Sequence, residues 1–282
     1  MIPDWETNQL FISDRLEIKF PDLVCSLRTA LAGTNISTIP GTADIWCRDY
    51  MPIQLDEKRF CQFVYSPDYL RGFEQTITQP QICRLPFMTD FDEEPIVLDG
   101  GNVVASRTKV ILTKKIFKEN PTFTETHLQE RLEQTFQAEC IFIGKEPYDP
   151  IGHSDGVVRF VSEDRVLISD FSIINPDYGG KLRYQLTEAG LEVETLPLFY
   201  EKSIKRGSFS SAVGNYINFL RVGNVVVVPE YGTHHDDIAV EKIRHVIPNA
   251  VVTQLPCRSL AEEGGVLNCI SWTIKDESAV QE

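Results

Sequence analysis

A recurring order of elements is the feature that most constrains how this 282-residue chain folds. Short apolar stretches recur at intervals of roughly fifty to sixty residues, which lies in the period range of repeat architectures. The five stretches end at Thr38-Ile39-Pro40, Arg84-Leu85-Pro86, Ile141-Phe142-Ile143-Gly144, Thr195-Leu196-Pro197 and Gln254-Leu255-Pro256. The five units fill the chain and no linker separates them, so we expect residues 1–282 to form one domain.

A strand-like run follows each of these endings, after a polar, Gly-rich or Pro-rich stretch. The five runs cover residues 51–55, 102–104, 156–161, 216–220 and 266–272. The candidate functional residues lie at the beginnings of these runs. The candidate functional residues therefore come from five separate units of the chain.

Helical spacing fills several of the intervals. Segment 126–137 places three apolar side chains on one helical face, namely Leu128, Leu132 and Phe136. Thr126 and Gln129 are spaced as a capping box, which predicts where this helix begins. A second helix is predicted to open at Pro21 and to bury Leu23, Leu27 and Leu31.

Residues 225–252 show how one unit is built. Val225 to Val228 is a continuous β-branched run that suits a buried strand, segment 237–246 has helical spacing, and residues 250–252 return to strand character. Each such mixed α/β unit leaves an apolar face uncovered when it stands alone. We therefore expect the units to close into a ring, with the motif loops converging on its axis.

The charge of the chain limits its partners. Asp and Glu number 41 against 27 Lys and Arg, a formal net charge of −14, which argues against binding to nucleic acid or to an anionic membrane and favours cationic ligands. Residues 1–6 lack the basic and apolar regions of a signal peptide, and no apolar run reaches membrane-spanning length. We expect a cytoplasmic protein. Seven cysteines without a CxxC pair indicate neither a disulfide framework nor a zinc site, and we expect no metal and no cofactor.

A cysteine and a histidine are candidates for covalent chemistry. Cys269 follows Gly264-Gly265, whose backbone can approach a ligand closely, and His153 is followed two residues later by a carboxylate. A thiolate is the attacking form of cysteine, and histidine is suited to moving protons near neutral pH. The alternatives are an inert thiol in a core strand with Leu267 and Ile270, and a histidine that only makes structural hydrogen bonds.

Three aspartates complete the pattern. In an extended strand entry, His153 and Asp155 would share a face, and Asp49 lies three residues after Trp46, an indole that can stack on a planar cation. Paired carboxylates match the N–H edges of a guanidinium group. For Asp155 and for Asp99, which precedes two glycines, the alternative is a turn residue, and for Asp49 it is a solvated ion pair. Together the residues predict a thiol enzyme whose partner is a small cationic guanidino compound.

The motifs resemble those of the agmatine deiminases and the related bacterial, Porphyromonas-type peptidylarginine deiminases of the guanidine-modifying superfamily. Five motifs occur in the family order, namely Trp46-Cys47-Arg48-Asp49, Asp99-Gly100-Gly101, Gly152-His153-Ser154-Asp155, Asn215-Tyr216-Ile217-Asn218-Phe219 and Gly264-Gly265 through Cys269. The resemblance spans nearly the whole chain. It implies an α/β fold, a five-bladed pseudo-symmetric α/β propeller built of ββαβ-type repeats and forming one catalytic domain.

The resemblance also implies roles for seven residues: Cys269, His153 and Asp99 in catalysis, and Asp49, Asp155, Trp46 and Asn218 in substrate binding. Cys269 would attack the guanidinium carbon and form a thiouronium-like intermediate, while His153 moves protons. Asp99 would orient His153, although its reach is left open because agmatine deiminases commonly have a longer glutamate there. The products would be ammonia and a urea, which is N-carbamoylputrescine if the substrate is agmatine.

Departures from the family pattern leave the substrate open. The chain is shorter than typical agmatine deiminases, lacks their Trp-Pro opening and lacks the Asp-Gly-x-Gly-Thr continuation after Gly101. The acidic charge and the start of the chain favour agmatine and hence putrescine and polyamine synthesis, with peptidyl or free arginine as the alternative. Whether the protein forms a homo-oligomer is left open.

Two hypotheses come from other classes. His234-His235-Asp236-Asp237, with His153 and Asp155, could ligate a metal ion in a metal-dependent hydrolase. Adjacent histidines rarely reach one ion, so a helix-opening turn with Asp236 or Asp237 as the N-cap is favoured. A non-catalytic guanidinium-binding protein is the third hypothesis.

Overall fold

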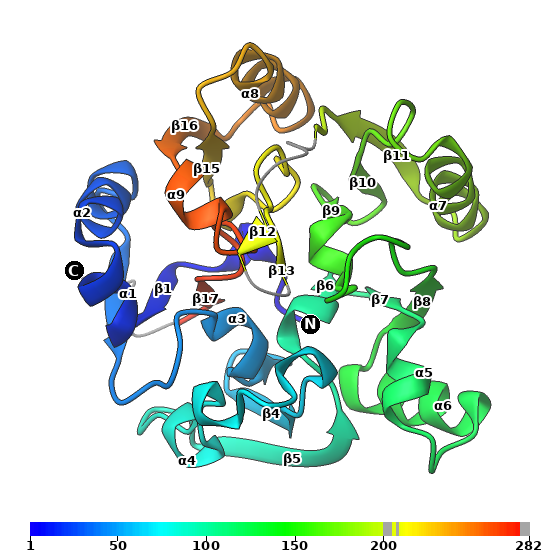
Figure 1. Cartoon of the computed structure of the whole chain (residues 1–282). Helices are drawn as coiled ribbons and strands as arrows, with labels where there is room; N and C mark the ends of the chain where they lie inside the picture. Colours follow the sequence, from blue (N-terminus) through cyan, green and yellow to red (C-terminus); the bar gives the residue numbers. More distant parts are fainter. Residues whose placement is uncertain (200–204, 207–208, 277–282) are drawn as a thin grey trace.

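Five small sheets stand around a central axis like the blades of a propeller (Figure 1). The computed structural model describes residues 1–199, 205–206 and 209–276, and these form five three-stranded sheets and one two-stranded sheet. The two-stranded sheet pairs β12 (Lys205–Arg206) with β13 (Phe209–Ser210). The fold is therefore mixed α/β, as predicted.

Four blades repeat one order, an antiparallel strand pair followed by a helical crossover to a parallel third strand. The second blade contains β3 (Ile53–Gln54), β4 (Arg59–Val64), α4 (Pro80–Cys83) and β5 (Asp90–Val97). The third contains β6 (Val104–Ala105), β7 (Lys109–Thr113), α5 (Lys115–Glu119), α6 (Glu125–Phe136) and β8 (Glu139–Ile143). The fourth contains β9 (Val158–Phe160), β10 (Arg165–Ser169), α7 (Pro176–Glu188) and β11 (Glu192–Leu196). The fifth contains β14 (Leu220–Val222), β15 (Val225–Glu230), α8 (His235–Val246) and β16 (Val251–Pro256).

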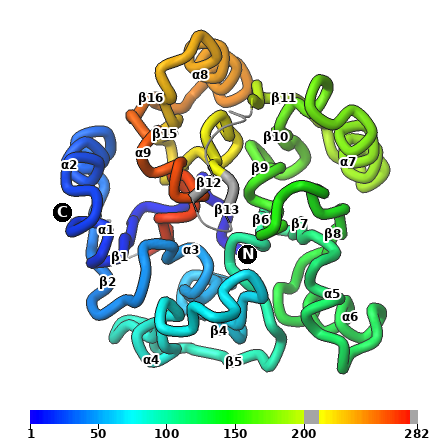
Figure 2. Tube along the Cα trace, viewed as in Figure 1, coloured from blue at the N-terminus to red at the C-terminus, as the bar shows by residue number. Residues whose placement is uncertain are grey.

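The first blade joins the two ends of the described chain. Its central strand, β1 (Gln9–Ser13), lies parallel to β2 (Asn35–Ile39) and antiparallel to β17 (Trp272–Ile274), with α1 (Asp14–Lys19) and α2 (Pro21–Ala30) between β1 and β2. The tube in Figure 2 shows the first and last segments, in blue and red, meeting beside the axis. Strands from opposite ends of the sequence thus close the ring.

Helices cover the outer edges of the sheets, and the helix faces that pack inward are the apolar faces predicted from the spacing. Leu128, Leu132 and Phe136 of α6 are buried in the core of the third blade, and Leu23 and Leu27 of α2 are buried in the core of the first and fifth blades. The predicted start of α6 is wrong, because the hydroxyl of Thr124, not Thr126, accepts the cap hydrogen bond from the His127 N–H.

Three strand predictions are shifted. The ending at residues 84–86 is not a strand end, because the parallel strand of that blade is β5, whose charged sequence Asp90 to Glu94 lacks apolar alternation. The runs at 216–220 and 266–272 are buried except for the partly exposed Cys269, but they become strand only at Leu220 and Trp272. In both, the preceding backbone turns toward the axis, and the N–H groups of Asn268 and Cys269 donate to Asn218 Oδ1 instead of a ladder.

The segments that connect successive blades gather at one end of the axis. Three of them carry short helices, α3 (Cys47–Tyr50), η4 (Gly100–Asn102) and η5 (Ser154–Gly156), and α3 contacts η4, which contacts η5. The other two run from β11 to β14, where residues 211–219 lie, and from β16 to β17, where α9 (Arg258–Ala261) precedes residues 264–271. The ring therefore brings together the five motif segments, which lie far apart in the sequence.

Candidate active site

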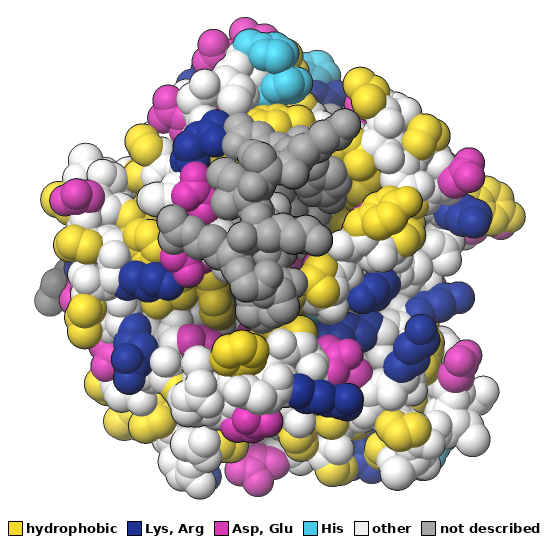
Figure 3. Space-filling model, viewed as in Figure 1, with side chains coloured by type: hydrophobic (Ala, Val, Ile, Leu, Met, Phe, Trp, Pro, Cys, Tyr) yellow, Lys and Arg dark blue, Asp and Glu magenta, His cyan; other side chains and the backbone are white. Residues whose placement is uncertain are grey.

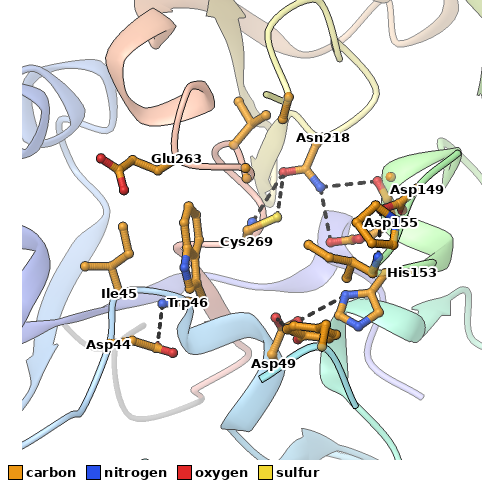
Figure 4. Close-up of a pocket in the computed structure, with 18 of the residues that line it drawn as sticks. Asp44, Ile45, Trp46, Asp49, Asp149, His153, Asp155, Asn218, Glu263 and Cys269 are labelled. Carbon is orange, nitrogen blue, oxygen red and sulfur yellow. Dashed lines mark hydrogen bonds and ion pairs between the residues drawn. The ribbon is translucent and has the colours of Figure 1, made fainter. Parts of the chain in front are cut away.

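A cavity of about 690 Å³ opens where these connecting segments meet. Six of the seven predicted site residues line it, namely Trp46, Asp49, His153, Asp155, Asn218 and Cys269. Asp99 lies behind His153, to which it is hydrogen-bonded. Figure 4 shows Cys269 at the centre of the group, with Trp46 on one side and His153 and Asp155 on the other.

Cys269 is held by its backbone and by Asn218. The Asn218 Oδ1 atom accepts hydrogen bonds from the Cys269 N–H and from its Sγ, each at 3.3 Å, and the Cys269 carbonyl accepts the Arg48 N–H at 3.2 Å. Burial raises the pKa of the Cys269 thiol well above its usual value, and the Asp155 and Asp49 carboxylates raise it further. The sulfur is therefore a protonated thiol in the free protein at neutral pH.

Gly265 allows Trp46 to pack against the segment that carries the cysteine. A Cβ atom at residue 265 would lie 2.5 Å from the Trp46 ring and 3.1 Å from the Cys269 Cβ atom. The indole consequently stands beside Cys269, where a flat cation can stack on it.

His153 lies between two carboxylates. Its Nε2 atom is 2.9 Å from Asp99 Oδ2, and its Nδ1 atom is 3.5 Å from Asp49 Oδ1. Burial alone would lower the pKa of His153, but the negative charges of Asp49 and Asp99 outweigh burial and raise the pKa to about 9. The imidazole is therefore protonated at neutral pH and ready to donate a proton.

Asp99 reaches His153 despite its short side chain. Burial disfavours its charged form, but the hydrogen bond and charge of His153 and the charge of Lys115 outweigh burial and lower the pKa of Asp99. The Lys115 Nζ atom lies 3.1 Å from Asp99 Oδ2 and 2.9 Å from Glu119 Oε1. The chain Lys115–Asp99–His153 keeps the aspartate ionised behind the imidazole.

Asp49 is positioned by the helix α3 and by Gly101. Its Oδ1 atom accepts the Gly101 N–H at 3.1 Å, and its Oδ2 atom accepts the Tyr69 hydroxyl at 3.3 Å. Burial raises the pKa of Asp49 to about 6, with the His153 charge opposing this and Asp99 and Asp155 adding to it. A bound cation would offset much of the cost of burying the charged Asp49 carboxylate, so this carboxylate favours a positively charged ligand.

Asp155 is the second cavity carboxylate and is held by two amides. Its Oδ2 atom accepts hydrogen bonds from Asn218 Nδ2 at 3.2 Å and from Asn268 Nδ2 at 2.6 Å. The predicted strand entry is wrong here, because residues 154–156 form the 3₁₀ helix η5. His153 and Asp155 nevertheless both line the cavity, since one short turn separates them.

Three residues of this site were not predicted from the sequence. Lys115 and Asn268 are buried against the predicted aspartates, and Tyr69 contacts both Asp49 and the His153 ring. Asn268 stands next to Cys269 in the motif, so its position was a usable signal. Lys115 and Tyr69 lie outside the motifs and only the packing identifies them.

The histidine pair that suggested a metal hydrolase lies at the start of α8, with His234 as the N-cap and His235 as the first helical residue. Asp236 accepts hydrogen bonds from the Tyr216 hydroxyl at 2.6 Å, the Tyr231 N–H at 2.9 Å and the Thr233 N–H at 2.7 Å. Neither Asp236 nor Asp237 is the N-cap, because α8 begins at His235. In the described part of the chain, no three His, Cys, Asp or Glu side chains group as metal ligands.

A sequence model of one family, described as Porphyromonas-type peptidyl-arginine deiminase, matches residues 15–274. The chain belongs to this family. A Streptococcus mutans relative whose name places it with the agmatine deiminases is 22% identical over 235 residues, which is 72% of this chain and 63% of that protein. The chain thus matches less than two thirds of the length of that family member.

Solved structures share the fold. An agmatine deiminase of Enterococcus faecalis superposes with a TM-score of 0.78 at 16% identity, covering 98% of this chain and 95% of that one. A substrate-bound agmatine deiminase of C. jejuni gives a TM-score of 0.77 at 16% identity over 96% of this chain and 95% of the other. The five-bladed family fold is therefore present here.

Across residues 1–199, 205–206 and 209–276, no helix is both long and apolar enough to span a membrane.

Proposed function

We propose that this protein is a deiminase that hydrolyses the guanidinium group of agmatine to N-carbamoylputrescine and ammonia. One observation carries the proposal: the Cys269 thiol shares a cavity with the His153 imidazole and with the two carboxylates of Asp49 and Asp155. The names of the relatives support the substrate class. We extend the proposal to residues 1–282 as one catalytic domain, acting in the cytoplasm on a small cationic compound.

Binding of the cation would activate the thiol. Asp49 and Asp155 would each accept N–H groups of the guanidinium while Trp46 covers its face. The bound positive charge offsets the two causes that raise the pKa of Cys269, its burial and the neighbouring carboxylates. The substrate thereby favours the thiolate in the site where the free enzyme holds a thiol.

The first half of the reaction exchanges nitrogen for sulfur. The thiolate attacks the guanidinium carbon and forms the C–S bond, and His153 gives its proton to the departing nitrogen, which leaves as ammonia. A pKa of about 9 keeps His153 protonated for this step. The result is a positively charged thiouronium attached to Cys269.

The second half restores the enzyme. Neutral His153 takes a proton from water, and the hydroxide oxygen adds to the thiouronium carbon. The C–S bond then breaks, the proton of the added hydroxyl passes to the leaving sulfur, and the products are the Cys269 thiol and an uncharged urea. Asp99 and Lys115 would hold the imidazole in place through both proton transfers.

Peptidyl arginine is the second candidate substrate. The family description names it, and Arg15 of α1 lines the cavity, where a cation suits a carboxylate or a peptide carbonyl. Agmatine is preferred because the net charge of the chain, −14, favours a ligand that carries two positive charges.

A substrate panel tests the proposal. Agmatine, free arginine and arginine-containing peptides are compared by the release of ammonia and of ureido product, and agmatine is expected to give the highest kcat/KM. Turnover of peptides alone would move the enzyme to the second candidate. Turnover of none of them would contradict the deiminase itself.

The covalent step is tested with Cys269. Mass spectrometry of the acid-quenched enzyme with agmatine is expected to show an adduct on the peptide that contains Cys269. Cys269→Ser should lose the adduct and nearly all turnover, since a hydroxyl ionises far less readily than a thiol. Cys25→Ser, at an exposed cysteine, is the control and should keep both.

A further inference from the structure

A second cavity, of about 670 Å³, lies beside the proposed active site. It is bounded by the segment around η2 (Asp68–Leu70), by α5 and by the residues after β8. Its charged lining consists of Arg71, Lys114, Lys115, Lys118, Lys145, Asp68 and Glu119. Figure 3 shows dark blue side chains gathered on this part of the surface, over α5 and the end of β8.

The positive charge of this lining is not neutralised from within. Five cations face two carboxylates, so the lining carries 5 − 2 = +3 in a chain whose total charge is −14. Both carboxylates already pair with Lys115, whose Nζ atom is 3.5 Å from Asp68 and 2.9 Å from Glu119. Among residues 1–199, 205–206 and 209–276, no carboxylate pairs with Arg71, Lys114 or Lys118.

Of the five cations, Lys115 is buried, and the side chains of Arg71, Lys114, Lys118 and Lys145 are exposed on a backbone that the fold holds in place. The Lys145 side chain packs on Gly152, where a Cβ atom would lie 2.6 Å from the Lys145 Cδ atom, and its Nζ atom is 3.3 Å from the Pro150 carbonyl oxygen. The Lys114 N–H donates to the Ile143 carbonyl at 2.9 Å, which ties the start of α5 to the end of β8. Lys115 is buried and also lies over the Tyr69 ring.

Such an arrangement suits a compact, multiply charged anion. Lysine binds phosphate oxygens as a point charge, and arginine binds them through its planar fork. A concave site with clustered cations also concentrates anions from solution. We propose that this cavity binds a small multivalent anion of the phosphate or pyrophosphate class.

Two side chains connect the second cavity to the proposed active site. Lys115 lines the second cavity and contacts Asp99, the hydrogen-bond partner of His153. Lys115 and Asp99 would therefore stand between a bound anion and the imidazole. The proposal concerns binding, however, and holds whether or not the protein is a deiminase.

Isothermal titration calorimetry with inorganic pyrophosphate tests it on the full chain at constant ionic strength. The wild-type protein is expected to bind one pyrophosphate saturably, and Lys118→Glu is expected to bind it at least about tenfold more weakly, because a charge-assisted contact becomes a repulsion. Lys181→Glu, on the exposed face of α7, changes the net charge equally and should bind as the wild type does.

Three results would overturn the proposal. They are the absence of saturable binding to the wild-type protein, an equal loss of affinity in Lys118→Glu and Lys181→Glu, and unchanged affinity in both Lys118→Glu and Arg71→Ala. Circular dichroism of each variant verifies that the fold is intact. The Arg71→Ala variant lies outside α5, so it still tests the site if Lys118→Glu disturbs that helix.

Discussion

Cys269 and His153 have the reverse of the protonation states that an isolated thiol–imidazole pair would need for attack. Burial and the charges of Asp155 and Asp49 hold the sulfur as a thiol, while the charges of Asp49 and Asp99 hold the imidazole as a cation. Neither group is active alone. A guanidinium cation bound between Asp49 and Asp155 would favour the thiolate of Cys269, and the protonated His153 would then act as the proton donor.

The state of the thiol can be measured by alkylation. In the free protein, the rate at which iodoacetamide modifies Cys269 is expected to stay low at neutral pH and to rise only at alkaline pH, because burial raises the pKa of its thiol. Peptide mass spectrometry over a pH series measures this rate. Exposed Cys25, which the reagent can reach in the folded protein, serves as the internal reference for the amount of reagent. A rate for Cys269 that is already high at neutral pH would contradict the assignment.

Asp99→Asn tests the raised pKa of His153. The Asp99 carboxylate favours the imidazolium, so its removal should lower the pKa of His153 from about 9 and move the alkaline limb of the kcat/KM profile to lower pH. The turnover of agmatine as a function of pH measures the shift. Asp177→Asn at the start of α7 is the matched control. An unmoved alkaline limb would mean that another group sets it.

The short helices between the blades position the site because glycines let them touch. A Cβ atom at Gly100 would lie 2.1 Å from the Arg48 carbonyl oxygen, and one at Gly101 would lie 2.5 Å from His153 Nδ1 and 2.6 Å from Asp49 Oδ1. The contact between α3 and η4 therefore requires glycine at residues 100 and 101. The 3₁₀ helices η4 and η5 contribute no apolar side chain to the core, whereas α3 contributes Cys47 and Tyr50.

Gly101→Ala is expected to lower kcat/KM about a hundredfold, since the added methyl group must displace His153 or Asp49 by a fraction of an ångström or more. Steady-state kinetics measure this loss, and circular dichroism verifies the fold. Gly180→Ala in α7 is the control, because a Cβ atom there meets nothing within 4 Å. Similar activity in both variants would show that the site tolerates the displacement.

The ring as a whole depends on the first blade, where β1 pairs with β17. Trp272 of β17 packs against Phe11 with ring centroids 5.1 Å apart and against Phe60 of the second blade at 6.0 Å, and its Nε1–H donates to the Pro52 carbonyl at 2.8 Å. This residue joins the end of the described chain to two blades. Cys269 lies three residues before it, so closure of the ring also places the proposed nucleophile.

Trp272→Ala should lower the free energy of unfolding by about 3–5 kcal/mol, because a large buried side chain is lost and the Pro52 carbonyl loses its donor. Urea denaturation measures the change. Tyr184→Ala, at an aromatic residue that is 64% exposed on α7, should change the stability little. A loss of less than about 1 kcal/mol for Trp272→Ala would contradict the importance of this closure.

The comparison of prediction and structure separates local pattern from long-range geometry. Amphipathic spacing identified α2, α6 and α8, and the β-branched run identified β15, because these signals arise from neighbouring residues. The charged strand β5 and the turns at 216–219 and 266–271 were assigned wrongly, since their backbone is set by partners elsewhere in the ring. The roles of the seven site residues stay predictions.

The repeated units, the order of the motifs and the kinds of side chains at the site can be read from the amino-acid sequence. Each unit and each motif is recognised from residues within a few positions of one another. The contact of Asp99 with His153, the place of Lys115 behind both and the second, positively charged cavity are visible only in the folded chain. Distances and pKa values depend on residues from different blades, and these meet only when the ring closes.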